Sequence, residues 1–234
     1  MRILAFETSA KAGSVALLED SQLLAESYQN TGLTHSQTLM TMAQDLLKNC
    51  GLTPSDVEAV AVAAGPGSFT GVRIGVAAAK GFAWGAELPC YGVSTLEAMA
   101  LNLGINTGYV LPVMDARRSQ VYNALFHAKD GVLQRCCQDR AISLEELAEE
   151  IKNLPSPVFL VGDGSVLCYN AFKENVPALV LPPEHHLHQR AAGVALAAVR
   201  QITAGDTGDA AALQPNYLRL SQAERERLAR EQQN

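Results

Sequence analysis

The sequence contains no long hydrophobic run: no apolar stretch in its 234 residues reaches the roughly 18–20 residues that a membrane-spanning helix needs. Its first apolar segment includes a carboxylate, Glu7, and is therefore a poor signal peptide. We expect a cytoplasmic protein with no membrane association.

Cysteines are few, and basic residues are outnumbered by acidic ones. The five cysteines are odd in number and have no C-x-x-C spacing, which is typical of free thiols in a reducing compartment. The chain has 18 lysines and arginines against 24 acidic residues, and the net charge of −6 argues against nucleic-acid binding by this chain alone. With 18% charged and 48% hydrophobic residues, the composition excludes an intrinsically disordered chain.

The order of predicted elements indicates a mixed α/β protein. Three short apolar strands joined by tight turns occupy the first thirty residues, so the opening strand pair is antiparallel and the sheet is not purely parallel. A helix is predicted over residues 35–50, and a strand buried on both faces over residues 57–64. Further helices are predicted over residues 95–103 and 187–203. The polar stretch after Gly104 is the best candidate boundary, because a second strand-rich block begins at Tyr109 and includes a strand predicted over residues 121–127.

The helix predicted over residues 71–85 has an unusually wide apolar surface. Its only charged residues, Arg73 and Lys80, share one side, which leaves an arc of roughly 280° that is apolar or glycine. Such a helix must be covered on more than one side. Its own sheet covers one side, so the rest needs another helix, a second domain or a partner chain.

The segment Gly65–Gly71 raises the question of a phosphate-binding loop. A Walker loop needs a lysine directly after its last glycine, where this chain has Val72, and the third glycine of a Rossmann fingerprint arrives one residue late. We favour glycines that permit a tight turn and close helix packing, and leave open an anion at the helix N-terminus. With the strand-end carboxylate at Glu7, which in some phosphotransferases positions a metal, the residues of this vestigial nucleotide or anion loop are Glu7, Thr8, Ser9, Gly65, Gly67, Ser68, Thr70 and Arg73.

The remaining candidate residues favour structural roles. His35 lies near a helix start, where a capping or packing role is commoner than that of a base. The trio His185, His186 and His188 lies in one proline-flanked loop, whereas zinc sites usually take ligands from several elements. The chain has no G-x-S-x-G elbow and no convincing Ser/His/Asp set, so we predict no catalytic residue and no metal site.

Four motifs of the chain together form a recognisable series. They are Ile3-Leu4-Ala5-Phe6-Glu7-Thr8-Ser9, Gly65-Pro66-Gly67-Ser68-Phe69-Thr70-Gly71-Val72-Arg73-Ile74-Gly75, Gly92-Val93-Ser94-Thr95-Leu96 and Pro215-Asn216-Tyr217-Leu218-Arg219. On these motifs the chain resembles the bacterial TsaB (YeaZ) family, over its first hundred residues and again at the C-terminus. That family is the accessory subunit of the machinery that makes threonylcarbamoyladenosine at position 37 of tRNAs.

The resemblance implies an α/β fold of the actin/Hsp70/sugar-kinase-like (ASKHA) type, with two lobes that each contain a mixed sheet. The N-terminal lobe then spans residues 1–104 and the C-terminal lobe residues 105–186. Residues 187–220 contain a helix that returns to the first lobe, and residues 221–234 form a solvated tail.

The resemblance also implies that catalytic parts are missing. TsaD, the catalytic relative, carries an H-x-x-x-H metal pair where this chain has Thr95 and Met99, and a hydroxyl and a thioether cannot replace two imidazoles. The acidic residues that follow E-T-S in TsaD are here Lys11 and Ala12, and the glycine-rich loop of the second lobe is reduced to residues 162–164.

The function that follows is a non-catalytic scaffold that binds and activates TsaD. The partners implied are a TsaD-like subunit, a TsaE-like ATPase, a second copy of this chain in isolation, and tRNA only through the complex. No cofactor is expected, with ATP or ADP at the partner interface left open. The partner interface is expected at Leu39, Met42, Ala43, Leu46, Val72, Ile74, Gly75, Ala78, Ala79 and Phe82.

Two alternatives remain at this point. One is an ATP-dependent phosphotransferase or ATPase of the same fold, which would use Glu7 and the Gly65–Gly71 loop. The other is a peptidase, against which the absent metal pair and nucleophile set argue.

Overall fold

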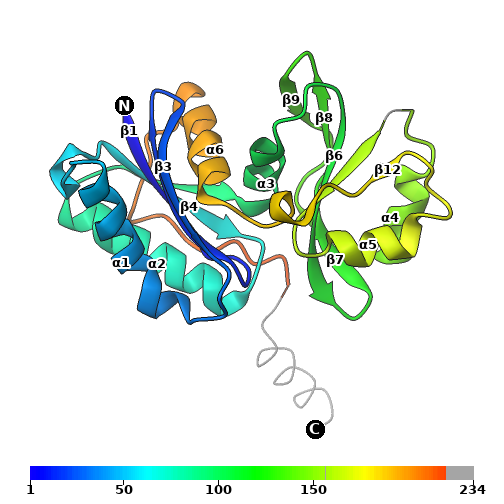
Figure 1. The fold of residues 1–234 in the computed structure, drawn as a ribbon, viewed down its shortest axis with the longest axis horizontal. Helices are drawn as coiled ribbons and strands as arrows, with labels where there is room; N and C mark the ends of the chain where they lie inside the picture. Colours follow the sequence, from blue (N-terminus) through cyan, green and yellow to red (C-terminus); the bar gives the residue numbers. More distant parts are fainter. Residues whose placement is uncertain (156, 220–234) are drawn as a thin grey trace, which may run out of the picture.

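A computed structural model describes residues 1–155 and 157–219 of the chain. These residues form two lobes that lie side by side, each built on its own β-sheet (Figure 1). The residues predicted as a solvated tail, 221–234, lie outside the described part.

The first lobe contains a mixed five-stranded sheet in the order β3-β2-β1-β4-β5. The first three strands form the predicted antiparallel meander, and β4 and β5 then join in parallel. The strands are β1 (Arg2–Glu7), β2 (Gly13–Glu19), β3 (Gln22–Gln29), β4 (Ala59–Gly65) and β5 (Cys90–Ser94).

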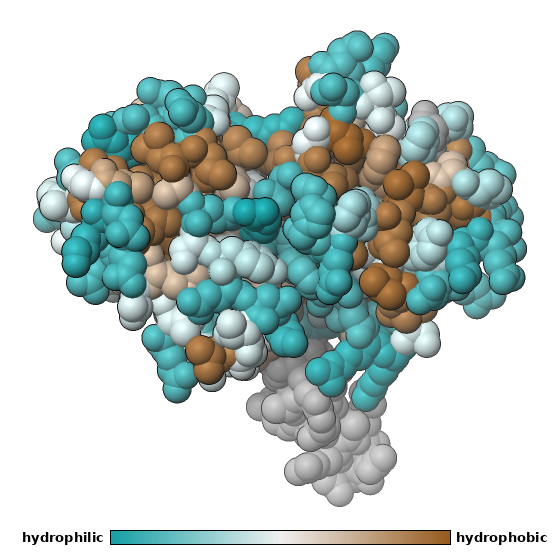
Figure 2. Space-filling view, in the orientation of Figure 1, coloured by the Kyte–Doolittle hydropathy of each residue, from teal (hydrophilic) through white to brown (hydrophobic). Residues whose placement is uncertain are grey.

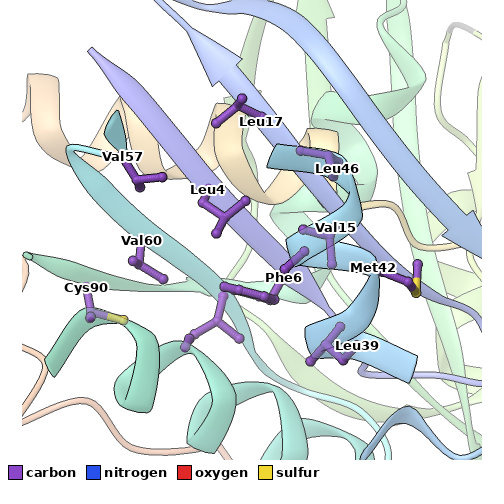
Figure 3. Close-up of a cluster of buried hydrophobic side chains, with 14 of the residues drawn as sticks. Leu4, Phe6, Val15, Leu17, Leu39, Met42, Leu46, Val57, Val60 and Cys90 are labelled. Carbon is purple, nitrogen blue, oxygen red and sulfur yellow. The ribbon is translucent and has the colours of Figure 1, made fainter. Parts of the chain in front are cut away.

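Helices cover both faces of the first sheet, because alternate residues of its central strands are apolar on each face. Leu4 and Phe6 of β1 pack toward α1 (His35–Asn49) and α2 (Phe69–Gly85) (Figure 3). Ile3 and Ala5 of the same strand pack toward α6 (Ala191–Thr203), which also lies against α3 (Thr95–Leu103). The 3-10 helix η1 (Pro54–Asp56) leads into β4.

The second lobe contains a sheet in the order β10-β7-β6-β11-β12, with β8 paired to β6 and β9 paired to β8. Helices α4 (Leu144–Ile151) and α5 (Ser165–Phe172) contribute Leu147, Cys168 and Phe172 to its core. The 3-10 helix η2 (Glu184–His186) precedes α6. The strands are β6 (Gly108–Arg117), β7 (Gln120–Asn123), β8 (Phe126–Lys129), β9 (Val132–Arg135), β10 (Arg140–Ser143), β11 (Val158–Val161) and β12 (Leu179–Val180).

After α6 the chain returns along the first lobe and covers one side of α2 (Figure 1). Lys80 donates to the main-chain oxygens of Ala211 and Leu213, at 3.2 and 3.0 Å, and the amide of Asn216 donates to the Ala64 oxygen at 2.6 Å. Part of the second covering that the wide apolar surface of α2 requires therefore comes from the chain itself.

Candidate functional site

The Gly65–Gly71 loop lies directly on the end of β1. The Thr8 hydroxyl donates to the Gly71 oxygen at 2.8 Å, and the Ser68 amide donates to the Ser9 oxygen at 2.7 Å. A Cβ at Gly71 would lie 2.1 Å from the Thr8 oxygen, and one at Gly67 2.5 Å from the Ser9 oxygen. The glycines are therefore required where the backbone of β1 approaches the start of α2, which supports their interpretation as packing residues.

Glu7 is fully buried at the end of β1. Its Oε1 accepts a hydrogen bond from the Ser9 amide at 2.5 Å, whereas its Oε2 has no partner among the described residues. Burial raises the pKa of Glu7 to about 7, and the negative charge of Asp163 from the second lobe adds to this shift. Glu7 is therefore protonated in a large fraction of molecules near neutral pH.

A polar cleft of about 480 Å³ lies between the lobes. Lys11, Arg117 and Asp115 extend into it from the surface, and Asp163 accepts from Gln189 at 3.1 Å. Although Asp163 stays accessible from the cleft, loss of water around it raises its pKa, with a smaller contribution from Asp115. Figure 2 shows the hydrophilic strip at the junction, with hydrophobic side chains gathered on each lobe.

Arg73 is engaged within the chain. Its Nε donates to the Tyr217 hydroxyl at 2.7 Å, and its guanidinium lies 3.8 Å from the centre of the Phe69 ring. Ser68 forms the N-cap of α2 and accepts from the Gly71 amide at 3.3 Å, and Thr70 is exposed beside it. The predicted anion loop is thus assembled in one place, but its single cation already has a partner.

The positions that correspond to a metal pair have no ligands for one. Thr95 and Met99 are both buried, and the Met99 sulfur lies 3.1 Å from where a Cβ of Gly162 would be. No group of three histidine, cysteine or acidic residues that could hold a metal occurs in residues 1–155 and 157–219. His35 donates from its Nε2 to the Ala10 oxygen, 2.8 Å away, which is a packing role.

The loop histidines do not converge with other ligands within the described residues. His185 and His186 are exposed and lie against each other, with ring centres 4.2 Å apart, and His188 is half-buried. The five cysteines are all free.

The structure corrects most of the expected partner interface. Seven of its ten residues are buried in the core of the first lobe, because α1 and α2 direct them toward the sheet; Figure 3 shows this for Leu39, Met42 and Leu46. The three that are partly accessible are Ile74, Ala78 and Phe82. The buried seven are Leu39, Met42, Ala43, Leu46, Val72, Gly75 and Ala79.

The exposed side of α2 consists of residues outside the ten expected interface positions. Arg73, Ala77, Gly81 and Trp84 follow one another at intervals of three or four, and we call them the outer stripe. Trp84 is 76% exposed, an unusual position for so large an apolar side chain. Val72, Val76 and Ala79 contact the sheet and so fix the rotation of α2 about its axis. This rotation identifies the residues of the outer stripe.

Solved structures share the two-lobed arrangement. A Pseudomonas aeruginosa structure named YeaZ superposes with a TM-score of 0.76 and 28% identity, covering 93% of this chain and 99% of that one. A 2-hydroxyglutaryl-CoA dehydratase component A from Acidaminococcus fermentans superposes with a TM-score of 0.50 at 12% identity, over 84% and 96% of the two chains. The protein thus has the two-lobed fold of the actin/Hsp70/sugar-kinase-like (ASKHA) type.

Curated relatives define the family more narrowly. Proteins named tRNA threonylcarbamoyladenosine biosynthesis protein TsaB are 34% identical in Bacillus subtilis, over 96% of both chains, and 36% identical in Escherichia coli, over 94% of this chain and 95% of that one. Residues 27–227 match the family model described as TsaD, tRNA N6-adenosine threonylcarbamoyltransferase. The chain belongs to the TsaB (YeaZ) family. Within its described residues, every helix is too short or too polar to cross a membrane.

Proposed function

We propose that this chain is the non-catalytic subunit that binds and activates a TsaD-like catalytic subunit, which transfers threonylcarbamoyl to adenosine 37 of tRNA. A TsaE-like ATPase joins the complex, which works in the cytoplasm. The chain contacts tRNA only as part of this complex. The observation that carries the proposal is a contrast: the chain matches the transferase family model, yet Thr95 and Met99 are sealed in its core.

The proposed absence of catalysis by the chain alone rests on four residues. Thr95 and Met99 offer a hydroxyl and a thioether, which are weak ligands for the divalent ions that two histidines would hold. Glu7 has a raised pKa and is fully buried. Arg73, the one cation of the glycine loop, is bound to Tyr217.

The outer stripe of α2 is the proposed contact with the catalytic subunit. Ala77 and Gly81 have small side chains, which let a partner helix approach closely, and Trp84 supplies a large apolar anchor at the end of the stripe. Ile74 and Phe82 are partly accessible and also pack against the core, so they extend the apolar surface beside the stripe. In isolation the same surface would pair with a second copy.

The test is a reconstitution of tRNA threonylcarbamoylation with the cognate TsaD, TsaE, ATP and threonylcarbamoyl-AMP, with and without this chain. We expect turnover only when the chain is present. Ala77→Glu should abolish both activation and co-elution with TsaD, whereas Ala171→Glu, an equally charged change at an exposed alanine of α5, should leave both intact. Full turnover without this chain would overturn the proposal, and so would equal behaviour of the two variants.

Assays of the isolated chain test the two alternative functions. Magnesium-dependent ATP hydrolysis that is lost in Glu7→Gln would favour a phosphotransferase or ATPase. Cleavage of a partner protein that a single substitution abolishes would favour a peptidase.

A further inference from the structure

A groove of about 400 Å³ lies between the edge strand β3 and helix α1, on the opposite side of the first lobe's sheet from α6. It is separate from the inter-lobe cleft, and none of its lining residues belongs to the outer stripe. The lining residues are Ala25, Glu26, Ser27, Gln29, Gln37, Thr38, Thr41, Met42, Asp45, Leu46 and Asn49.

The free edge of β3 forms one wall of this groove, because β3 pairs only with β2 among the described strands. The Asp20 amide donates to the Met1 oxygen, so these two residues form a hydrogen-bonded pair between β1 and β2. In an antiparallel ladder every second residue pair is hydrogen-bonded in this way. By alternation, Ala16 directs its main-chain groups toward β1, and its neighbours direct theirs toward β3. It follows from the register that Glu26 and Tyr28 direct their amides and carbonyls away from β2, into the open edge.

The side chain of Glu26 is held on the other face of the sheet. Its carboxylate binds Arg190, whose Nε lies 2.9 Å away, and accepts from the Ala192 amide at 3.1 Å. Glu26 therefore lines the groove with its main chain. The edge is long enough to pair with a short extended segment, and α1 forms a second wall above it, as in sites where a peptide adds as a strand to a sheet.

The chemistry of the lining selects for hydrogen-bond donors and positive charge. Beside the apolar Ala25, Met42 and Leu46, its polar side chains are hydroxyls, amides and the exposed carboxylate of Asp45, and none of the lining residues is a lysine or arginine. Gln29 contributes a buried Oε1 that lacks any hydrogen-bond partner in the described structure. An unpartnered buried acceptor has a cost that a donor on a ligand would remove.

We propose that the groove between β3 and α1 binds an extended peptide segment carrying an arginine or lysine, which adds to β3 as an edge strand and directs its cation toward Asp45. A second copy of this chain fits less well. Pairing β3 with β3 would bring two grooves with the same carboxylates and no lining cation together.

The experiment uses the isotope-labelled full chain and the peptide Thr-Val-Arg-Val-Arg-Thr with blocked ends, in low salt. We expect the exchange of the Glu26 and Tyr28 amides with solvent to slow on binding. Asp45→Lys should weaken binding by about fivefold or more, since it replaces an attraction with a repulsion. Glu174→Lys, which makes the same charge change at an exposed residue of the other lobe, should leave binding unchanged.

A peptide methylated at alternate amide nitrogens keeps its charge but cannot pair with a strand, so it should not bind. Equal binding of the methylated peptide would overturn the proposal, as would equal losses in the two variants. Slowed exchange that depends on protein concentration without peptide would assign the edge to a second copy instead.

Discussion

Arg73 donates a hydrogen bond from its Nε to the Tyr217 hydroxyl at 2.7 Å and so joins two sequence motifs that lie far apart in the chain. The Phe69 ring completes the contact, because it stacks on Tyr217 with ring centres 4.7 Å apart. One motif opens α2, and the other is the Pro215–Arg219 segment. Their meeting explains how the C-terminal segment is held along the first lobe.

We expect Tyr217→Phe to loosen this segment by removing one hydrogen bond to a charged group while keeping the ring stack. Exchange of the Asn216 amide, which donates to the Ala64 oxygen, should rise by roughly fivefold, as expected for a loss of about 1 kcal/mol. Tyr217→Ala should raise it further, since the stack is also lost. Tyr169→Phe is the control in the second lobe, and unchanged exchange of Asn216 in both Tyr217 variants would contradict the prediction.

Local signals in the sequence predicted some elements well. Helix α3 spans Thr95–Leu103 as predicted, because the Ser94 side chain caps its first turn and Gly104 adopts a left-handed conformation after it. By contrast, the strand predicted over residues 121–127 is two strands, β7 and β8. They pair with different halves of β6, and this division depends on a tertiary partner that local sequence does not specify.

Two helices begin at other residues than the sequence predicted. Helix α2 begins at Phe69, two residues before the predicted start, because Ser68 caps it. Helix α6 begins at Ala191 and not at Leu187, since Arg190 is extended and bound to Glu26 of β3.

Two glycines of α2 should respond to alanine in opposite ways. A Cβ at Gly75 would lie 2.3 Å from the Thr8 hydroxyl, so Gly75→Ala should destabilise the protein by about 1–3 kcal/mol. At Gly81 nothing lies within 4 Å, and Gly81→Ala should stabilise it by about 0.5–1 kcal/mol through helix propensity. Urea unfolding measures both, and a shared direction of change would refute this account of α2.

The candidate site illustrates a different limit of sequence reasoning. Periodicity predicted that α2 needs more than one covering, and the glycine loop was interpreted as a packing feature with an anion left open. Periodicity could not give the rotation of the helix about its axis. Val72 and Ala79 were therefore assigned to a partner, although they face the sheet. That rotation is set by contacts with β4, which lies several residues away along the chain.

Glu97 of α3 links both lobes, and we expect its charge to matter. It accepts from Arg135 of β9 at 3.0 Å and from Arg200 of α6 at 3.1 Å. Glu97→Gln should lower the free energy of unfolding by on the order of 1 kcal/mol in dilute salt, and by less in about 1 M salt, which screens the charges. Glu149→Gln, which removes an exposed pair with Lys152, is the control and should have little effect. A loss that is the same at both salt concentrations would argue against an electrostatic link.

The buried carboxyl of Glu7 predicts a specific dependence of stability on pH. Burial raises the pKa of Glu7 to about 7 from an ordinary value of 4.5, so between these pH values the folded chain holds a proton that the unfolded chain releases. Stability from this group is therefore constant below about pH 4.5, falls as the pH rises toward 7, and is lost above it.

Glu7→Gln cannot ionise, and its amide oxygen can still accept from the Ser9 amide. The free energy of unfolding of the variant, relative to the wild type, should thus rise between about pH 5 and pH 8 by on the order of 3 kcal/mol. Guanidinium unfolding at both pH values measures this difference, with Glu174→Gln on the surface as the control. If the Glu7→Gln and wild-type curves run parallel across this range, Glu7 ionises freely in the folded protein, and its burial does not disfavour the charge.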